Sequence, residues 1–271
     1  MDRIVKIFAK TFQLFLMLLP LTVIAAPFPA VNSPYREDLT YKVTISNKSS
    51  GHDIEMKNLA QKALRREMPQ RLEIAIERKK IADKNIIVFT RVEYLQSGNT
   101  ARWQFVMDTG THIVMRSMKK KITTQDGSLV REELVNFRAR GQGYPDDLLH
   151  AHVVELALRG IDFNTSYRNS FPIYLTSINI INMDLKVLGR ETVEVPAGKF
   201  DCWKVEMKPH LEDWVGKIVA NLLRSFTPNY IYWFAVDQNH HLVKYQGILG
   251  AIGAPVQVVE LVEMRCCDAV D

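Results

Sequence analysis

The sequence predicts a mainly β protein, an antiparallel barrel that stays open, with about a dozen strands and two or three helices on or in its concave face. Much of the 271-residue chain alternates apolar and polar side chains with the period of two that is typical of strands. Short turn sequences separate these segments, so neighbouring strands should run antiparallel. Two apolar segments in the second half have helical spacing instead, and they suit helices packed on or in a curved sheet.

The first 25 residues have the layout of a secretory signal peptide. Three basic residues precede an uncharged apolar run at residues 11–26, and small residues follow. This run is shorter than the roughly 20 apolar residues of a membrane-spanning helix. We expect cleavage, export to the periplasm and one domain over residues 26–271; a retained membrane anchor is the alternative.

The first half of the mature chain reads as a meander of strands with one inserted helix. Turn residues such as Ser97–Asn99 and Gln125–Gly127 separate the strands. The helix is expected at Asp53–Arg66. The strands are expected at residues 39–46, 71–78, 85–95, 101–108, 112–122 and 128–137.

The middle of the chain predicts an apolar helix. Asp146 is a suitable N-cap, an apolar run follows at residues 148–158, and Gly160 can end the helix. Because apolar residues cover most of its circumference, this helix needs burial on most sides. A second helix, with one apolar face, is expected at residues 212–226.

Residues 189–208 predict a β-hairpin. Val193 and Val195 face one way, Pro196-Ala197-Gly198 can form the turn with Gly198 in the left-handed conformation, and a return strand follows. Alternating apolar residues beside a tight turn are what any hairpin needs for packing. The other strands of this half are expected at residues 171–180, 183–189, 229–236, 241–249 and 256–264.

This hairpin, together with a later aromatic strand, resembles a group of uncharacterised bacterial envelope proteins. The residues that carry the resemblance are Gly189, Glu191, Val193, Val195, Pro196, Ala197, Gly198, Phe200, Trp233 and Asp237. Related domains resemble the LolA, LolB and RseB type of periplasmic fold, an unclosed antiparallel barrel whose concave face is lined by helices. The resemblance implies a hydrophobic cavity for an acyl chain or a peptide, and it implies no catalytic residues.

Three cysteines, Cys202, Cys266 and Cys267, would lie in an oxidising compartment. The odd count leaves one thiol over if a single bridge forms. A disulfide between Cys202 and one of the C-terminal pair is one candidate. A bridge between the adjacent Cys266 and Cys267 would be strained.

The expected export and the pattern of the basic residues argue against a nucleic acid as partner. The formal charge of +5 falls to +3 once the +2 of the first 25 residues is removed. Basic clusters lie at residues 65–66, 78–80 and 119–121, but no aromatic residues interleave them. We interpret them as solvated strand ends and loops, with contact to an anionic membrane surface as the alternative.

No common catalytic or metal-binding motif occurs in the sequence, and we expect no metal and no cofactor. His150 and His152, on a predicted helix, should point about 200° apart and could not share a ligand. His240 and His241 should also point in opposite directions, beside a turn. The paired carboxylates at residues 132–133, 146–147 and 212–213 are expected as helix caps and solvated faces.

We therefore expect a non-catalytic periplasmic binding or carrier protein for an apolar, lipid-like ligand, because helices against a curved sheet often leave an apolar pocket. The candidates for its lining are Leu149, Val153, Leu156, Trp214, Ile218, Leu222, Tyr232 and Trp233, although strand aromatics are often core residues instead. One alternative is an interaction module that docks an envelope protein through an exposed strand edge or the basic clusters. Another is a hydrolase of envelope polymer, which needs titratable groups that converge in a cleft.

Overall fold

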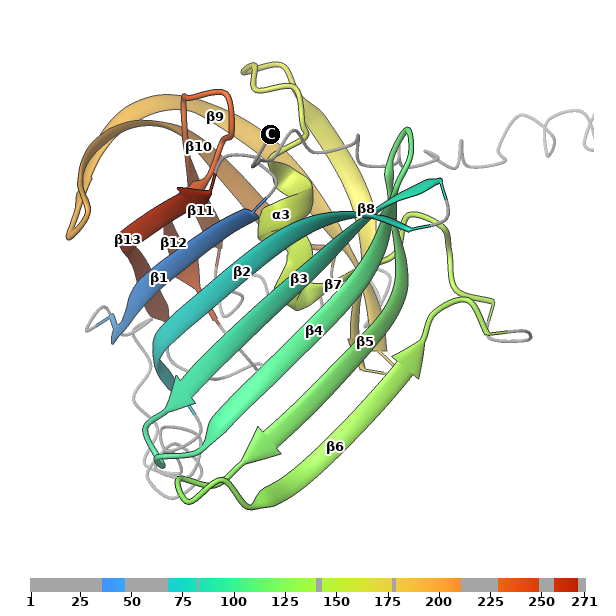
Figure 1. Cartoon of the computed structure of the whole chain (residues 1–271). Helices are drawn as coiled ribbons and strands as arrows, with labels where there is room; N and C mark the ends of the chain where they lie inside the picture. Colours follow the sequence, from blue (N-terminus) through green and yellow to red (C-terminus); the bar gives the residue numbers. More distant parts are fainter. Residues whose placement is uncertain are drawn as a thin grey trace, which may run out of the picture.

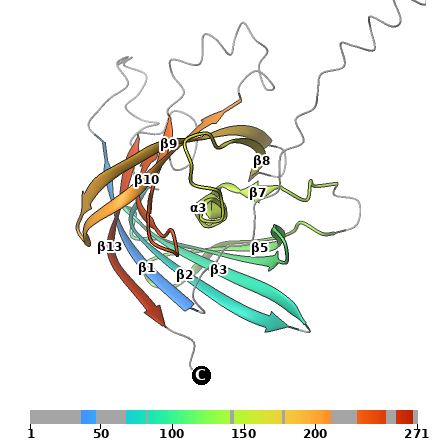
Figure 2. The same cartoon turned by 90° about the horizontal axis from the view of Figure 1, so that it is seen from above.

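The protein folds into one curled β-sheet around a short helix. The computed structural model describes residues 36–46, 68–81, 83–139, 143–176, 179–210, 229–248 and 256–267. Their strands form a 13-stranded sheet in the order β6-β5-β4-β3-β2-β1-β13-β12-β11-β10-β9-β8-β7. Figures 1 and 2 show that this sheet curls around α3, and its end strands β6 and β7 are not paired with each other in the described part of the chain. The predicted open, mainly antiparallel architecture is confirmed.

The elements follow one another along the chain, and short connections join the strands from β2 to β6. They are β1 (Arg36–Ile45), β2 (Pro69–Ile81), β3 (Lys84–Leu95), β4 (Thr100–Thr109), β5 (Ile113–Thr123), β6 (Leu129–Asn136), β7 (Leu149–His150), the 3₁₀ turn η1 (Ala151–Val153), α3 (Val154–Leu158), β8 (Arg168–Thr176), β9 (Asn179–Val195), β10 (Gly198–Pro209), β11 (Tyr230–Ala235), β12 (Leu242–Gly247) and β13 (Gln257–Cys267). Among the described residues, eleven strand pairs are antiparallel, and only β7 and β8 run parallel.

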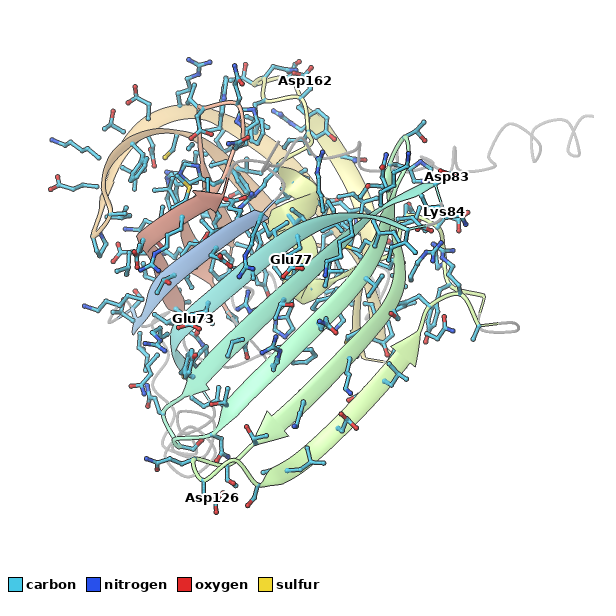
Figure 3. The ribbon with its side chains drawn as sticks, in the orientation of Figure 1. Glu73, Glu77, Asp83, Lys84, Asp126 and Asp162 are labelled. Carbon is cyan, nitrogen blue, oxygen red and sulfur yellow. The ribbon has the colours of Figure 1, made fainter. Side chains whose placement is uncertain are left out.

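Alternation along the strands separates a buried inner wall from a solvated outer face. On β2, Leu72, Ile74 and Ile76 are buried, whereas Glu73 and Glu77 lie on the outer face (Figure 3). Both carboxylates form ion pairs along their own strand, with Arg71 at 2.9 Å and Lys79 at 2.7 Å respectively. The period of two therefore places the apolar side chains of β2 toward α3.

Helix α3 lies in the middle of the curl (Figure 2), and all five of its residues are buried. This agrees with a helix that is apolar around most of its circumference. The predicted start at Asp146 is wrong, because Leu149 and His150 form β7 and pair with β8 instead. The carboxylate of Asp146 accepts a hydrogen bond from Arg138, and the His150 side chain caps η1. The pairing with a distant strand outweighs the local preference for helix.

The segment before the hairpin differs from the sequence prediction. Residues 183–195, expected as two strands, belong to the single 17-residue strand β9. Lys204 pairs with Gly189 while Val205 pairs with Val187, so a bulge at Leu188 bends the strand without ending it. Gly189 and Gly198 have φ values of 141° and 129°, which favour glycine; the expected backbone of the turn at Gly198 is confirmed.

Several predicted segments lie outside the described residues. These are the signal peptide at residues 1–25 and the helices at 53–66 and 212–226, with the cavity candidates Trp214, Ile218 and Leu222. Within the described ranges, no helix has the length and apolar character needed to traverse a lipid bilayer.

The candidate disulfide of Cys202 is not formed. Cys202 is a buried free thiol on β10, and burial raises its pKa to about 12, so it stays protonated. Strands β11 and β12 lie between β10 and β13 in the sheet, which separates their backbones by about 14 Å measured along it. A disulfide needs two Cα atoms within about 7 Å of each other. Cys202 is therefore too far from the end of β13 to form one.

Candidate functional site

A row of polar side chains crosses the inner wall over three neighbouring strands. Arg91 on β3 pairs with Trp103 on β4, and Trp103 pairs with Lys120 on β5. Because directly paired residues share a face of the sheet, the three side chains lie next to one another. Together with Glu93, two residues after Arg91, and with His150 and His152, they form what we call the inner-wall site.

Trp103 is the centre of this site. The ammonium of Lys120 lies 4.1 Å from the centroid of the indole ring, a cation–π contact, and the His152 ring lies 4.3 Å from it. The buried indole Nε1–H of Trp103 has no hydrogen-bond acceptor among the described residues. Burial lowers the pKa of Lys120, and Arg131 lowers it further.

The two histidines lie together, which corrects the prediction that they point apart. The rings of His150 and His152 stack with 5.2 Å between centroids, because His150 has strand rather than helix conformation. The Nδ1 atom of His150 accepts a 3.1 Å hydrogen bond from the backbone N–H of His152, so its neutral ring carries the proton on Nε2. Burial lowers the pKa of both rings well below 6.5, and the positive charges of Arg91 and Lys120 add to the effect. Both histidines are therefore neutral at pH 7.

Arg91 connects the inner-wall site to α3. Its guanidinium donates to Glu93 at 2.7 Å and to Glu155 of α3 at 3.4 Å. Burial alone would lower the pKa of Arg91, but these two carboxylates raise it; burial raises the pKa of Glu155. The Nη2 group of Arg91 is buried and has no acceptor within the described part of the chain.

The inner-wall site combines buried hydrogen-bond donors with neutral histidines. His152 Nδ1 lies 3.8 Å from a Glu93 carboxylate oxygen, beyond hydrogen-bond distance. Among the described residues, no three His, Cys, Asp or Glu side chains are placed to hold a metal ion. What the site does offer is a group of N–H donors with spare capacity, in Arg91, Trp103 and Lys120.

The described cavity candidates are core residues. Leu149, Val153, Leu156, Tyr232 and Trp233 are all buried in the main apolar cluster. A side chain that lines a cavity of ligand size exposes part of its surface to that cavity, yet Val153 and Leu156 expose 0%. These five residues thus pack against protein.

Sequence reasoning missed Arg91, Glu93, Trp103 and Lys120. A signal was present, because Arg91 and Glu93 are in phase with Ile87 and Phe89, which the alternation places inside. Charged residues at inward positions of a strand are rare unless they are paired. Their partners could not be read locally, since they come from β4, β5 and α3.

The residues of the sequence motif form a separate cluster outside this site. The indole N–H of Trp233 donates to the Glu191 carboxylate, and the ammonium of Lys204 lies 3.1 Å from it. Asp237 accepts hydrogen bonds from the backbone N–H groups of Asn239 and His240, which closes the β11–β12 turn. His241 beside this turn is buried, and His240 is partly exposed.

Residues 145–254 match the model of a family described as a protein of unknown function, DUF3108. The expected resemblance to an uncharacterised family is confirmed over these residues, which include the β9–β10 hairpin and β11. No curated protein matches the sequence.

Several solved structures resemble this chain at low sequence identity. A β-barrel-like protein of the domain of unknown function DUF1849 from Brucella abortus has 12% identity and a TM-score of 0.39, covering 88% of this chain and 100% of its own. A protein with a YmcC-like fold from Bacteroides fragilis has 13% identity and a TM-score of 0.37, covering 89% and 100%. The hypothetical lipoprotein YmcC from Escherichia coli has 10% identity and a TM-score of 0.33, covering 85% and 84%.

Proposed function

We propose that this protein is a non-catalytic binding protein of the bacterial periplasm, and that its ligand is an amphipathic, lipid-like molecule with an anionic head group. The observation that supports it is the row Arg91–Trp103–Lys120, which places N–H donors with spare capacity on the inner wall of the sheet. A buried donor without an acceptor costs about 1–3 kcal/mol. A carboxylate or phosphate oxygen would remove this cost, and charge-assisted hydrogen bonds are the stronger kind.

The charge of Lys120, unpaired among the described residues, favours an anion over a cation. Glu93 and Glu155 both pair with Arg91, and both histidines are neutral. Lys120, in contrast, has no carboxylate within ion-pair distance among the described residues and lies over the Trp103 ring. Its ammonium is therefore available to a ligand.

Apolar side chains lie on the inner wall beside the row Arg91–Trp103–Lys120. The next inward pair beyond Trp103 and Lys120 consists of Ala101 on β4 and Ile122 on β5. Ala101 is buried and Ile122 is partly exposed, so an alkyl chain that follows this wall would cover apolar surface. Burial of such a chain contributes about 0.8 kcal/mol for each CH₂ group.

The test compares two soluble probes that share a tail and differ in the head group. We expect isothermal titration calorimetry of the mature protein to show binding of dodecanoate below its micelle concentration and little binding of dodecyltrimethylammonium. Lys120→Met should weaken dodecanoate binding about tenfold, the loss of about 1.4 kcal/mol for one charge-assisted contact. Lys121→Met, at the exposed neighbouring position, is the matched control and should bind as the wild type does. Absent binding of dodecanoate, or equal affinity in the Lys120→Met variant, would overturn the proposal.

A further inference from the structure

We infer that β6 pairs antiparallel with β6 of a second copy of the chain, centred on Glu132, so that one sheet continues through both copies. β6 is the end strand of the sheet, is eight residues long, and has β5 as its one partner in the described chain (Figure 1). The other end strand, β7, has two residues and offers almost no edge. An unpaired edge presents backbone N–H and C=O groups that another strand can complete.

The side chains of β6 are unusually apolar for a solvated edge. Leu129, Val130 and Leu134 are 57%, 55% and 72% exposed. They make up three of the eight large apolar side chains that are exposed in the described part of the protein. Clustered exposed apolar side chains mark interaction surfaces more often than scattered ones do.

The charges of β6 favour a second copy of β6 as its partner, in one antiparallel register. Arg131 and Glu133 share the inner face, two residues apart, and pair with each other at 3.0 Å within the chain. A two-fold axis at Glu132 places each Arg131 opposite the Glu133 of the second copy, which gives two cross-strand ion pairs. Moving the axis by one residue would place Glu133 opposite Glu133, or Arg131 opposite Arg131. Only the register centred on Glu132 is complementary to itself.

The neighbouring rows agree with this register. Lys120 of β5 pairs with Glu133, so the inner row would alternate in sign from Lys120 through Glu133 to the second copy's Arg131. On the outer face, Val130 of each copy would lie opposite Leu134 of the other copy. The two Glu132 side chains at the centre are like charges, but each is held 2.8 Å from a Lys119 ammonium.

The β5–β6 turn and the regular ladder between these strands keep β6 extended, as pairing requires. The β5–β6 turn is closed by Asp126, which lies at the lower end of the edge (Figure 3) and accepts a 3.0 Å hydrogen bond from the Ser128 N–H. The irregularity in the ladder falls between Ile122 and Thr123, opposite the start of β6, and the strand is regular from Arg131 onward. Each copy has one β6, so a two-fold dimer pairs the β6 edge of one copy with the β6 edge of the other. No β6 edge is then left for a third copy, and the assembly closes without forming fibres.

Light scattering coupled to size exclusion tests the inference on the mature protein. We expect a dimer for the wild type and a monomer for Arg131→Glu and for Glu133→Arg, each of which places like charges opposite each other twice. Mixing these two variants should restore a dimer containing one chain of each, because every cross-strand pair is then Glu opposite Arg. The repulsion within each chain remains in that mixture, so the recovery reports pairing between chains rather than folding.

Arg71→Glu is the control variant. Arg71 and Glu73 form the same kind of pair, at 2.9 Å, on β2, which is flanked by β1 and β3. Its charge reversal should leave the dimer intact. A monomeric wild type at every concentration would overturn the inference, as would a dimer that survives both β6 reversals or a mixture of the two variants that stays monomeric.

Discussion

The guanidinium of Arg159, directly after α3, donates a 2.6 Å hydrogen bond to the carboxylate of Glu37 on β1. The two side chains are 1% and 0% exposed, and 122 residues separate them in the chain. With Arg91 and Glu155, which join α3 to β3, this pair fixes the rotation of the helix inside the sheet. A helix surrounded by apolar side chains alone would have no such directional contact.

Removal of Arg159 should destabilise the protein strongly. Arg159→Met leaves the Glu37 carboxylate buried without its partner, which costs about 3–5 kcal/mol in comparable buried pairs. The double variant Glu37→Leu with Arg159→Met removes both charges and should recover most of that loss. Urea unfolding, monitored by circular dichroism, measures the unfolding free energies of the single and double variants. An equal loss in the single and double variants would mean that the charges are not coupled.

Acidification should destabilise the protein from about pH 6.5 downward. The pKa values of His150 and His152 are lower in the folded than in the unfolded chain, so below the unfolded value of about 6.5 the unfolded chain binds more protons. Each histidine then removes up to about 1.4 kcal/mol of unfolding free energy per pH unit, until its folded pKa is reached.

A variant without the two histidines isolates their contribution to the pH dependence of the unfolding free energy. His150→Asn with His152→Gln should flatten the fall in stability between pH 6.5 and 5. The raised pKa of Glu155 acts in the opposite direction, with stability lost as the pH rises above about 4.5, but Glu155 is present in both proteins. Urea unfolding at a series of pH values gives the comparison, and parallel curves would contradict the assigned shifts.

Gly247→Ala should cost about 1–3 kcal/mol, the usual penalty for overpacking a core. A Cβ at Gly247 would lie 2.8 Å from Cζ of Tyr245 and 2.9 Å from Cδ1 of Tyr230. Tyr245 is held in place, because its hydroxyl donates a 3.0 Å hydrogen bond to the Ile248 carbonyl. Gly110→Ala is the control, since a Cβ there would meet nothing within 4 Å. Thermal unfolding should separate the two variants, and equal midpoints would contradict the packing around Gly247.

Loss of the Glu191 carboxylate should leave the indole N–H of Trp233 without its acceptor. Trp233 is buried and that hydrogen bond lowers the pKa of Glu191, so Glu191→Leu should cost about 1–3 kcal/mol. Glu191→Gln keeps an acceptor oxygen and should cost less. Chemical unfolding measures the difference, and equal losses for the two substitutions would show that the hydrogen bond contributes little.

The strands could be predicted from the sequence because alternation is a local pattern. The hairpin turn at Gly198 has the expected backbone, and each strand of the first meander lies within a few residues of its predicted range. The start of the middle helix could not be predicted in this way. Leu149 and His150 are in β7 because Ile173 and Tyr174 of β8 pair with them, a contact with residues 24 positions later in the chain.

The candidate site was less accessible to prediction than the fold. The inward phase of Arg91 is readable from its strand, but its contact with Glu155 depends on where α3 enters the curl. The stack of His150 on His152 depends on the same change from helix to strand. Apolar lining residues were expected instead, and the five described ones are buried in the main apolar cluster.

The position of β1 in the sheet has a consequence for how the chain acquires its structure. β1 lies between β2 and β13, and its pairs run from Arg36 with Cys267 to Ile45 with Gln257. Contacts of such long range make folding slow, because a large loop must close before they form. The meander of the first half can assemble early, but one edge of β1 stays open until β13 has paired with it. During that interval the partly folded molecule is most exposed to aggregation, and a holding chaperone would have its greatest effect on it.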